Sequence, residues 1–177
     1  MSPGGLAADL GYAYPRPHLL QRAVQAFAGS RLGARLTPVT LAPMDRFVSR
    51  LTRGRVSLPV LLAGLPVLEL VVVGRKSGLR RVTHLIAIPF GQELAVLGTN
   101  FGQPRTPAWV LNLEDHPRAT VRHRGESREV VARPATDEER AAVMASAGAV
   151  FAGAVRYEER LAGRRRVRVF VLEPVSD

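Results

Sequence analysis

The stretch that decides the fold runs from Pro66 to Phe90 and reads PVLELVVVGRKSGLRRVTHLIAIPF. Residues 67–73 are almost continuously apolar and rich in β-branched side chains, which predicts a strand buried on both faces. The glycine-bounded turn GRKSG at 74–78 separates it from a second strand expected over 81–90. A short Gly-Gln turn then leads into a third strand at 93–100. Strands joined by such short turns must run antiparallel.

The rest of the chain adds helices and further strands. Thr106 as N-cap and Pro107 at the first helical position predict a helix that ends before Pro117. The segments ATVRHR and SREVVAR predict a hairpin around Gly125, and RVRVFVLEP a final strand. Thr136 and Glu139 form a capping-box pattern for a helix that reaches about residue 150, and a short helical piece is expected around Tyr157. This order predicts an α+β fold, an antiparallel barrel with helices packed outside.

The N-terminal part has a different character. Residues 1–17, with several glycines and prolines, predict a loose tail. Apolar residues at helical spacing predict an amphipathic helix over about 18–34 and a second helix over 43–52. We therefore divide the chain into a tail with its helix, residues 1–39, and a barrel domain, residues 40–177.

Composition narrows the functional classes. The chain has 177 residues, a formal net charge of +10 and no cysteine, which excludes disulfides and thiolate chemistry. Its four histidines are scattered without ligand spacing, so no metal site is expected. Residues 56–74 are apolar enough to imitate a membrane span, but Pro59, Gly64, Pro66 and Glu69 interrupt them. No signal peptide is visible, and the expected location is the cytoplasm.

The turn after the first strand concentrates positive charge. Arg75, Lys76, Arg80 and Arg81 fall within GRKSGLRR, and Lys76 is the only lysine of the chain. The guanidinium and ammonium groups, with the hydroxyl of Ser77, suit phosphate or carboxylate. Successive backbone N–H groups in such a turn can also form an anion-binding nest. The alternative is an ordinary solvated turn.

A second stretch, GTNFGQPRTPAW at 98–109, joins the end of a strand to the start of a helix. The unpaired N–H groups of a helix N-terminus favour an anion. Trp109 lies in the first turn of that helix, where it either borders a ligand or belongs to the core. If the strands are neighbours, this stretch and GRKSG flank one groove, basic on one side and aromatic on the other. Such a groove suits a large planar cofactor with an acidic tail.

Four segments in this order, VLELVVVGRKSGLRRVT, GTNFGQPRTPAWVLNLEDHPRATV, ATDEER and VFVLEP, resemble the deazaflavin-dependent nitroreductase family, which includes F420H2-dependent quinone reductases. The resemblance covers about residues 40–175. It implies a split β-barrel and the coenzyme F420, which carries a deazaflavin ring, a phosphate and a polyglutamate tail. It also implies that electrons pass as hydride from the reduced coenzyme to a small-molecule acceptor, while the protein orients and protects the donor.

The resemblance also implies roles for individual residues. The phosphate and tail side is expected at Lys76, Ser77 and Arg81, to which Arg75 and Thr83 are added. The ring and its linker are expected at Leu97, Gly98, Thr99, Asn100, Ala108, Trp109 and Asn112. The candidate catalytic residues are Thr99 and Tyr157, and the candidate substrate-binding residues are Phe151, Ala154 and Tyr157.

The chain departs from the family in two places. Asn100 stands where several relatives carry a cation. Relatives that reduce nitro compounds are rich in tyrosine before the last strand, whereas VFAGAVRYEER at 150–160 offers Phe151 and Ala154 and keeps only Tyr157. The expected acceptor is therefore a quinone, an enone or a similar electron-poor, apolar molecule, with nitro compounds disfavoured. Tyr157 can donate a proton to a substrate carbonyl, or it packs in the core; His84 is expected to be structural.

Two other functional hypotheses remain open. A related split-barrel reductase could use FMN instead of the deazaflavin. The basic charge alone is compatible with nucleic-acid binding, although no recognised motif is present and the arginines are dispersed.

A peripheral contact with an anionic membrane is compatible with the hypothesis that the protein is a reductase, because basic helices with apolar faces dock on such surfaces.

Overall fold

The computed structural model describes residues 5–14, 65–100, 104–150 and 165–175. Residues 1–12 and 68–177 form one compact unit, and residues 13–67 form a second. All helices and strands described below belong to the first unit. The helices expected at 18–34 and 43–52, and the helical piece around Tyr157, lie outside the described residues. The proposed boundary at residue 39 stays a prediction.

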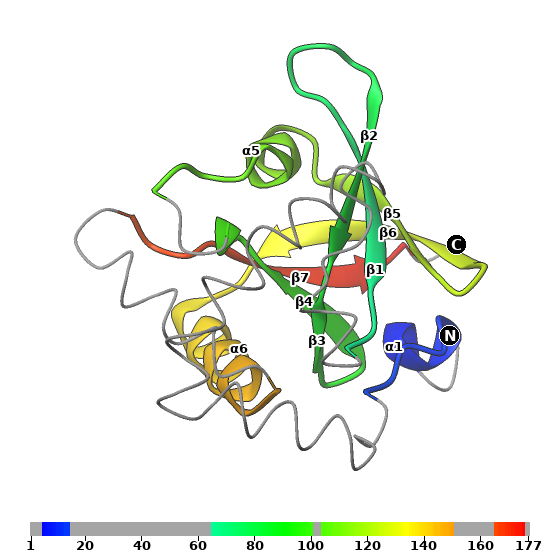
Figure 1. The fold of residues 1–177 in the computed structure, drawn as a ribbon, viewed down its shortest axis with the longest axis vertical. Coiled ribbons are helices and arrows are strands. Elements are labelled where there is room, and N and C mark those ends of the chain that lie inside the picture. The colour runs from blue at the N-terminus through cyan, green and yellow to red at the C-terminus, as the bar shows by residue number, and fades with distance from the viewer. Residues whose placement is uncertain (1–4, 15–64, 101–103, 151–164, 176–177) are drawn as a thin grey trace, which may run out of the picture. The chain divides into compact units, whose positions relative to one another are not determined.

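The first unit is built on a seven-stranded antiparallel sheet (Figure 1). Its strands are β1 (Leu68–Val73), β2 (Arg80–Leu85), β3 (Ala87–Phe90), β4 (Glu93–Leu97), β5 (Arg118–His123), β6 (Glu126–Pro134) and β7 (Val169–Pro174). The helices among the described residues are α1 (Gly5–Asp9), α5 (Ala108–Asp115) and α6 (Asp137–Val150). The hairpin predicted around Gly125 is therefore confirmed as β5 and β6.

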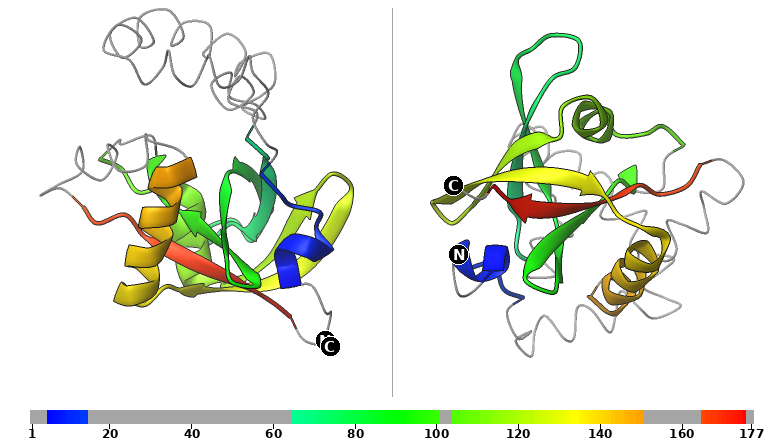
Figure 2. Two further views of the ribbon diagram at one scale, coloured as in Figure 1. Left: turned by 90° about the horizontal axis from the view of Figure 1, so that it is seen from below. Right: turned by 180° about the vertical axis from the view of Figure 1, so that it is seen from behind.

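The sheet curves because of the way β2 leads into β3. The strand order is β2-β1-β5-β6-β7-β4-β3, so β2 and β3 are the two edges of the sheet. Only Ile86 separates these edges in sequence. An edge-to-edge step of one residue requires the sheet to close on itself, and the result is the predicted split barrel (Figure 2). The expected single strand over 81–90 is therefore wrong: its first half pairs with β1 and its second half with β4.

The core forms where the inner side chains of the sheet meet. Leu68, Leu70 and Val72 of β1 are almost completely buried, as the apolar run predicted. On β7, Phe170 and Leu172 are equally buried. The β3–β4 hairpin lies between α1 and α6 (Figures 1 and 2), and the packing of α5 covers part of β1. The antiparallel barrel with outer helices is thus confirmed.

The predicted capping box at the start of α6 is present. The Glu139 backbone N–H donates to Thr136 Oγ1 at 3.2 Å, and the Thr136 N–H donates to Glu139 Oε2 at 2.9 Å. This reciprocal pair satisfies two backbone donors that helix geometry leaves without partners. His84 is held on β2 by its Nε2, which lies 3.3 Å from Glu69 Oε1. It fits the structural role expected of it.

Residues 5–12 contradict the expected loose tail. Leu6, Leu10 and Tyr12 are buried against the sheet. The Leu6 N–H donates to Gln92 O at 2.7 Å. The Tyr12 hydroxyl donates to Ala87 O at 3.1 Å and accepts from the Ala87 N–H at 2.9 Å. The segment therefore satisfies both backbone groups of Ala87, at the start of the edge strand β3.

Tyr12→Phe is expected to lower the free energy of unfolding by roughly 1–3 kcal/mol, because it leaves two buried backbone groups of Ala87 without the hydroxyl. The aromatic ring remains, and so does its edge-on packing at 4.9 Å from the ring of His123. Urea unfolding of the full chain measures the change. An unchanged midpoint would show that the hydroxyl does not support β3.

Arg133 ties three elements together. Its guanidinium donates to both carboxylate oxygens of Glu139 on α6, at 2.6 and 2.8 Å, and also to Glu173 on β7. The hydrogen bond from Arg133, followed by that from the Thr136 backbone, lowers the pKa of Glu139 from 4.5 to about 2. Because the pKa is lower in the folded state, this carboxylate stabilises the fold above pH 4.5 and loses its contribution as the pH falls toward 2.

Arg133→Met should therefore flatten the pH dependence of stability between pH 4.5 and about 2. Methionine keeps much of the apolar stem but removes the donors to Glu139. Thermal unfolding of both proteins across this range provides the comparison. Curves of equal slope would mean that Arg133 does not set the pKa of Glu139.

Candidate functional site

The β1–β2 hairpin closes in a tight turn at residues 74–79. The carbonyl of Gly74 accepts from the N–H groups of Ser77 and Gly78, and the Gly74 N–H donates to Leu79 O at 2.9 Å. Gly78 has φ 64°, a left-handed conformation that glycine adopts without strain. Ser77 Oγ accepts from Arg81 Nη2 at 3.5 Å. The turn thus presents its cations from a fixed backbone.

The expected backbone nest is not formed. The N–H groups of Arg75, Ser77, Gly78 and Leu79 all donate to acceptors within the protein. An anion at this turn therefore has to be bound mainly by side chains, the ammonium of Lys76 and the guanidinium groups beside it. This favours charge-assisted contacts that salt can screen.

Helix α5 starts one residue later than the sequence predicted. Pro107 is the N-cap, and no side chain caps the helix, so the expected role of Thr106 is wrong. The backbone angles of Pro107 show the shift: its φ of −58° is compatible with a helix, but its ψ of 143° is extended. Thr106 borders the pocket instead.

Asn112 connects α5 to the turn. Its Oδ1 accepts from the Arg75 backbone N–H at 3.1 Å, and the residue is buried. One side chain therefore fixes the distance between the helix and the basic hairpin. Sequence reasoning placed Asn112 near the ligand but gave no sign of this bridge.

Trp109 fits both roles considered from the sequence, a core residue and a residue that borders a ligand. It is only 7% exposed, and its ring lies 6.3 Å from that of Phe170 in a tilted arrangement. It also lines the pocket described next. Trp109 is thus a core residue with one part turned to the cavity.

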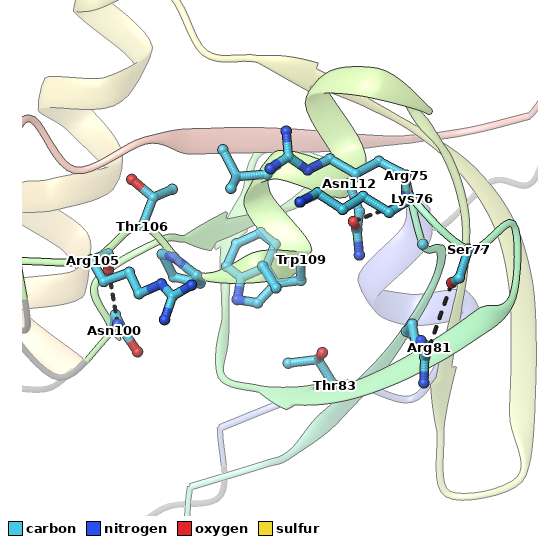
Figure 3. A pocket seen from close by; sticks show the side chains of 14 residues that line it. Arg75, Lys76, Ser77, Arg81, Thr83, Asn100, Arg105, Thr106, Trp109 and Asn112 are labelled. Carbon is cyan, nitrogen blue, oxygen red and sulfur yellow. Dashed lines mark hydrogen bonds between the residues drawn. The ribbon is translucent and has the colours of Figure 1, made fainter.

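A pocket of about 630 Å³ lies between the hairpin turn and the start of α5. In Figure 3, Trp109 lies between the basic hairpin residues on one side and Asn100, Arg105 and Thr106 on the other. The lining residues are Gly74, Arg75, Lys76, Ser77, Arg81, Thr83, Asn100, Arg105, Thr106, Pro107, Ala108, Trp109, Leu111 and Asn112. Every charged residue among them is a cation. The groove expected between the two stretches is therefore present, with positive charge at both ends.

The structure brings most of the expected ligand residues to this pocket and leaves others out. Nine of them line it: Arg75, Lys76, Ser77, Arg81, Thr83, Asn100, Ala108, Trp109 and Asn112. Leu97, Gly98 and Thr99 lie at the end of β4 and do not line it, and neither does Arg80. Phe151, Ala154 and Tyr157 lie outside the described residues.

The end of β4 does not line the pocket, but it packs against α5, which does. A Cβ on Gly98 would lie 2.7 Å from Val110 Cγ2, so the strand end packs tightly on α5 beside Trp109. Arg165 donates to the carbonyls of Gly98 at 2.9 Å and Thr99 at 2.8 Å. Burial, followed by the nearby charge of Arg168, lowers the pKa of Arg165. No local sequence signal could have identified this arginine, because it lies far along the chain from its acceptors.

Five lining residues were not among the predicted ligand residues: Gly74, Arg105, Thr106, Pro107 and Leu111. Arg105 and Leu111 belong to stretches that drew attention as motifs, yet neither was singled out. Asn100 has φ 48° and its Nδ2 donates to Arg105 O at 2.8 Å, so the two ends of this loop are joined. A cation shortly before a predicted helix start was the available signal for Arg105.

Asn112→Ala should destabilise the protein by roughly 1–3 kcal/mol, because the Arg75 N–H loses its acceptor. We also expect weaker binding of any anion that uses the hairpin cations. Asn112→Asp, which retains an acceptor oxygen, should lose less stability. Calorimetric unfolding of both variants measures this, and equal losses would contradict the bridging role.

No helix in the described parts of the chain has the length and apolarity that a membrane span requires. Within the same residues, no group of acidic or histidine side chains is arranged to hold a metal ion.

Comparison with known proteins provides independent evidence. The profile of the family F420H(2)-dependent quinone reductase matches residues 44–174. The solved structure of an F420-H2 dependent reductase, FDR-A, is 24% identical, has a TM-score of 0.56, and aligns over 61% of this chain and 94% of its own. A structure described as a domain-swapped dimer is 21% identical with the same TM-score, over 73% of this chain and 96% of its own. The two structures share the fold. On the family match, which spans most of the sequence, the chain belongs to the F420H2-dependent quinone reductase family.

Proposed function

We propose that this protein is an F420H2-dependent oxidoreductase that uses the 630 Å³ pocket to hold the coenzyme. One observation carries the proposal: Trp109 and four cations, with no acidic residue, line a single cavity. F420 combines a flat ring with a phosphate and several carboxylates. A cavity that is aromatic in the middle and positive at its ends fits such a molecule.

The residues that line the pocket fall into three groups according to the part of the coenzyme that they suit. Lys76, Arg81 and Arg75 supply the charge for the phosphate and the tail, and Ser77 adds a hydroxyl. Thr83, Asn100 and Arg105 complete the polar rim. Ala108, Trp109 and Asn112 hold the ring side, where the N-terminus of α5 adds a partial positive charge. Four cations also favour a polyanionic tail over the single phosphate of FMN.

When bound, reduced F420 supplies a hydride to an electron-poor small molecule, and we propose a quinone or an enone, with a nitro compound as the less favoured acceptor. The protein orients both partners and excludes water. Thr99 and Tyr157 are the candidate catalytic residues, since a hydroxyl can donate a hydrogen bond or a proton to an acceptor carbonyl. Arg165 donates a hydrogen bond to the carbonyl of Thr99, and this bond fixes the backbone that carries the Thr99 side chain. Phe151 and Ala154 are proposed to border the acceptor.

The test is an assay with purified full-length protein, reduced F420 and a soluble quinone. We expect the coenzyme to be oxidised only when both protein and quinone are present. Reduced FMN and NADH serve as alternative donors in parallel reactions. Oxidation that proceeds equally well with FMN, or no oxidation with any acceptor, would contradict the proposal.

A further inference from the structure

The tip and the outer side of the β1–β2 hairpin carry exposed apolar side chains. Leu79 is 60% and Val82 52% exposed, and within the described parts of the chain these are the large hydrophobic residues that water reaches most. Both lie within four residues of one another at the end of the hairpin, which extends beyond α5 in Figure 1. Apolar surface concentrated at a projecting tip suggests a contact surface.

This surface is separate from the pocket. Side chains alternate along a strand, and Arg81 and Thr83 of β2 line the cavity. Val82 and Arg80 therefore point to the opposite side of the strand, where Val82 is paired with Val71 and Arg80 with Val73. The hairpin thus has an inner side that lines the pocket and an outer side that carries Arg80 and Val82. Leu79 lies in the turn at the tip, just before β2, and does not line the pocket.

The charge around the tip is entirely positive. Arg75, Lys76, Arg80 and Arg81 are all exposed. Between Glu69 and Glu93 the sequence contains no acidic residue. A second copy of the tip would bring like charges together, and a nucleic acid would leave the apolar side chains without a partner. An anionic lipid surface matches both features, because it offers phosphates to the cations and acyl chains to Leu79 and Val82.

We propose that the tip and the outer side of the hairpin dock this protein on membranes that contain anionic lipids. Leu79 and Val82 enter the interface, and Arg80 contacts lipid phosphates. The inner side remains available to the pocket, so docking and ligand binding use different faces of one hairpin. The proposal does not depend on the identity of the coenzyme.

Sedimentation with large unilamellar vesicles tests the proposal on the full chain. We expect wild-type protein to bind vesicles of phosphatidylcholine with phosphatidylglycerol, and not vesicles of phosphatidylcholine alone. Leu79→Ser with Val82→Thr should lower the partition coefficient about tenfold, because half-exposed apolar side chains lose their burial in lipid. Arg80→Ser should lower it about fivefold. Arg122→Ser, which removes the same charge from β5 near the other end of β1, should change it less than about twofold.

Several results would overturn the proposal. One is a wild-type protein that does not bind the anionic vesicles. Another is a Leu79→Ser/Val82→Thr variant that binds as well as wild type, which places docking elsewhere on the chain. A third is a wild-type dimer in sedimentation equilibrium that this variant converts to a monomer, which assigns the patch to self-association. Far-ultraviolet circular dichroism confirms that each variant is folded, and the single substitution Arg80→Ser tests the surface if the double variant is not.

Discussion

Lys76→Ala combined with Arg81→Ala is expected to weaken F420 binding about a hundredfold, since each charge-assisted hydrogen bond is worth roughly 1.5–3 kcal/mol and exposure places both at the lower end. Both side chains line the pocket from the hairpin, and neither belongs to the core. Stability should therefore be nearly unchanged. Trp109 is the only tryptophan of the chain and lines the same pocket, so quenching of its fluorescence measures the dissociation constant directly.

The matched control removes two positive charges outside the pocket. Arg118→Ala with Arg122→Ala changes two exposed residues of β5 and leaves the cavity intact. It should weaken binding only through the general field of the protein, by less than about threefold at physiological salt. If both double variants lose the same affinity, the hairpin cations have no specific role.

Gly98→Ala is expected to lower both stability and F420 affinity, and it acts through shape alone. The added Cβ would lie 2.7 Å from Val110 Cγ2 and 3.4 Å from Arg168 O. Val110 is fully buried, so its side chain has little room to move. We expect a loss of roughly 1–3 kcal/mol in the free energy of unfolding, as for other overpacked core sites. Since Val110 follows Trp109 in α5, a shifted helix also displaces a wall of the pocket.

A double-mutant cycle with Val110→Ala isolates this contact. Val110→Ala removes the atom that the new Cβ meets, although it leaves a cavity of its own. The double variant should therefore be more stable than the sum of the single effects predicts. Urea unfolding and Trp109 fluorescence provide the two readouts. If the effects of the two substitutions are strictly additive in both stability and F420 affinity, the contact between Gly98 and Val110 of α5 is not the reason for the effect of Gly98→Ala.

The strands were predictable where their pattern is local. The apolar run of β1, the alternation of β5 and β6 and the capping box of α6 depend on neighbouring residues, and all are confirmed. The break at Ile86 was not predictable, because both halves of the segment are extended and only their different partners separate them. The buried segment ending at Tyr12 was missed for a similar reason, since its partner Ala87 lies 75 residues away.

In the candidate site too, features that depend on neighbouring residues were predictable, and features that depend on distant residues were not. Cations and small residues within GRKSG, and the tryptophan after a proline, were visible as motifs and do line one pocket. The internal bonding of the turn was not visible, so the nest was expected where Gly74 O and Asn112 already accept the donors. Arg165 reaches Gly98 and Thr99 from near the end of the chain, and only the folded arrangement reveals it.

A crystal structure of the protein with F420 is the most direct measurement of the central claim. That claim is that the hairpin cations and the start of α5 enclose one flat polyanion. We predict electron density for a single coenzyme that contacts Trp109 at one part and Lys76 or Arg81 at another. Coenzyme bound elsewhere on the protein, with this pocket filled only by solvent, would contradict the account.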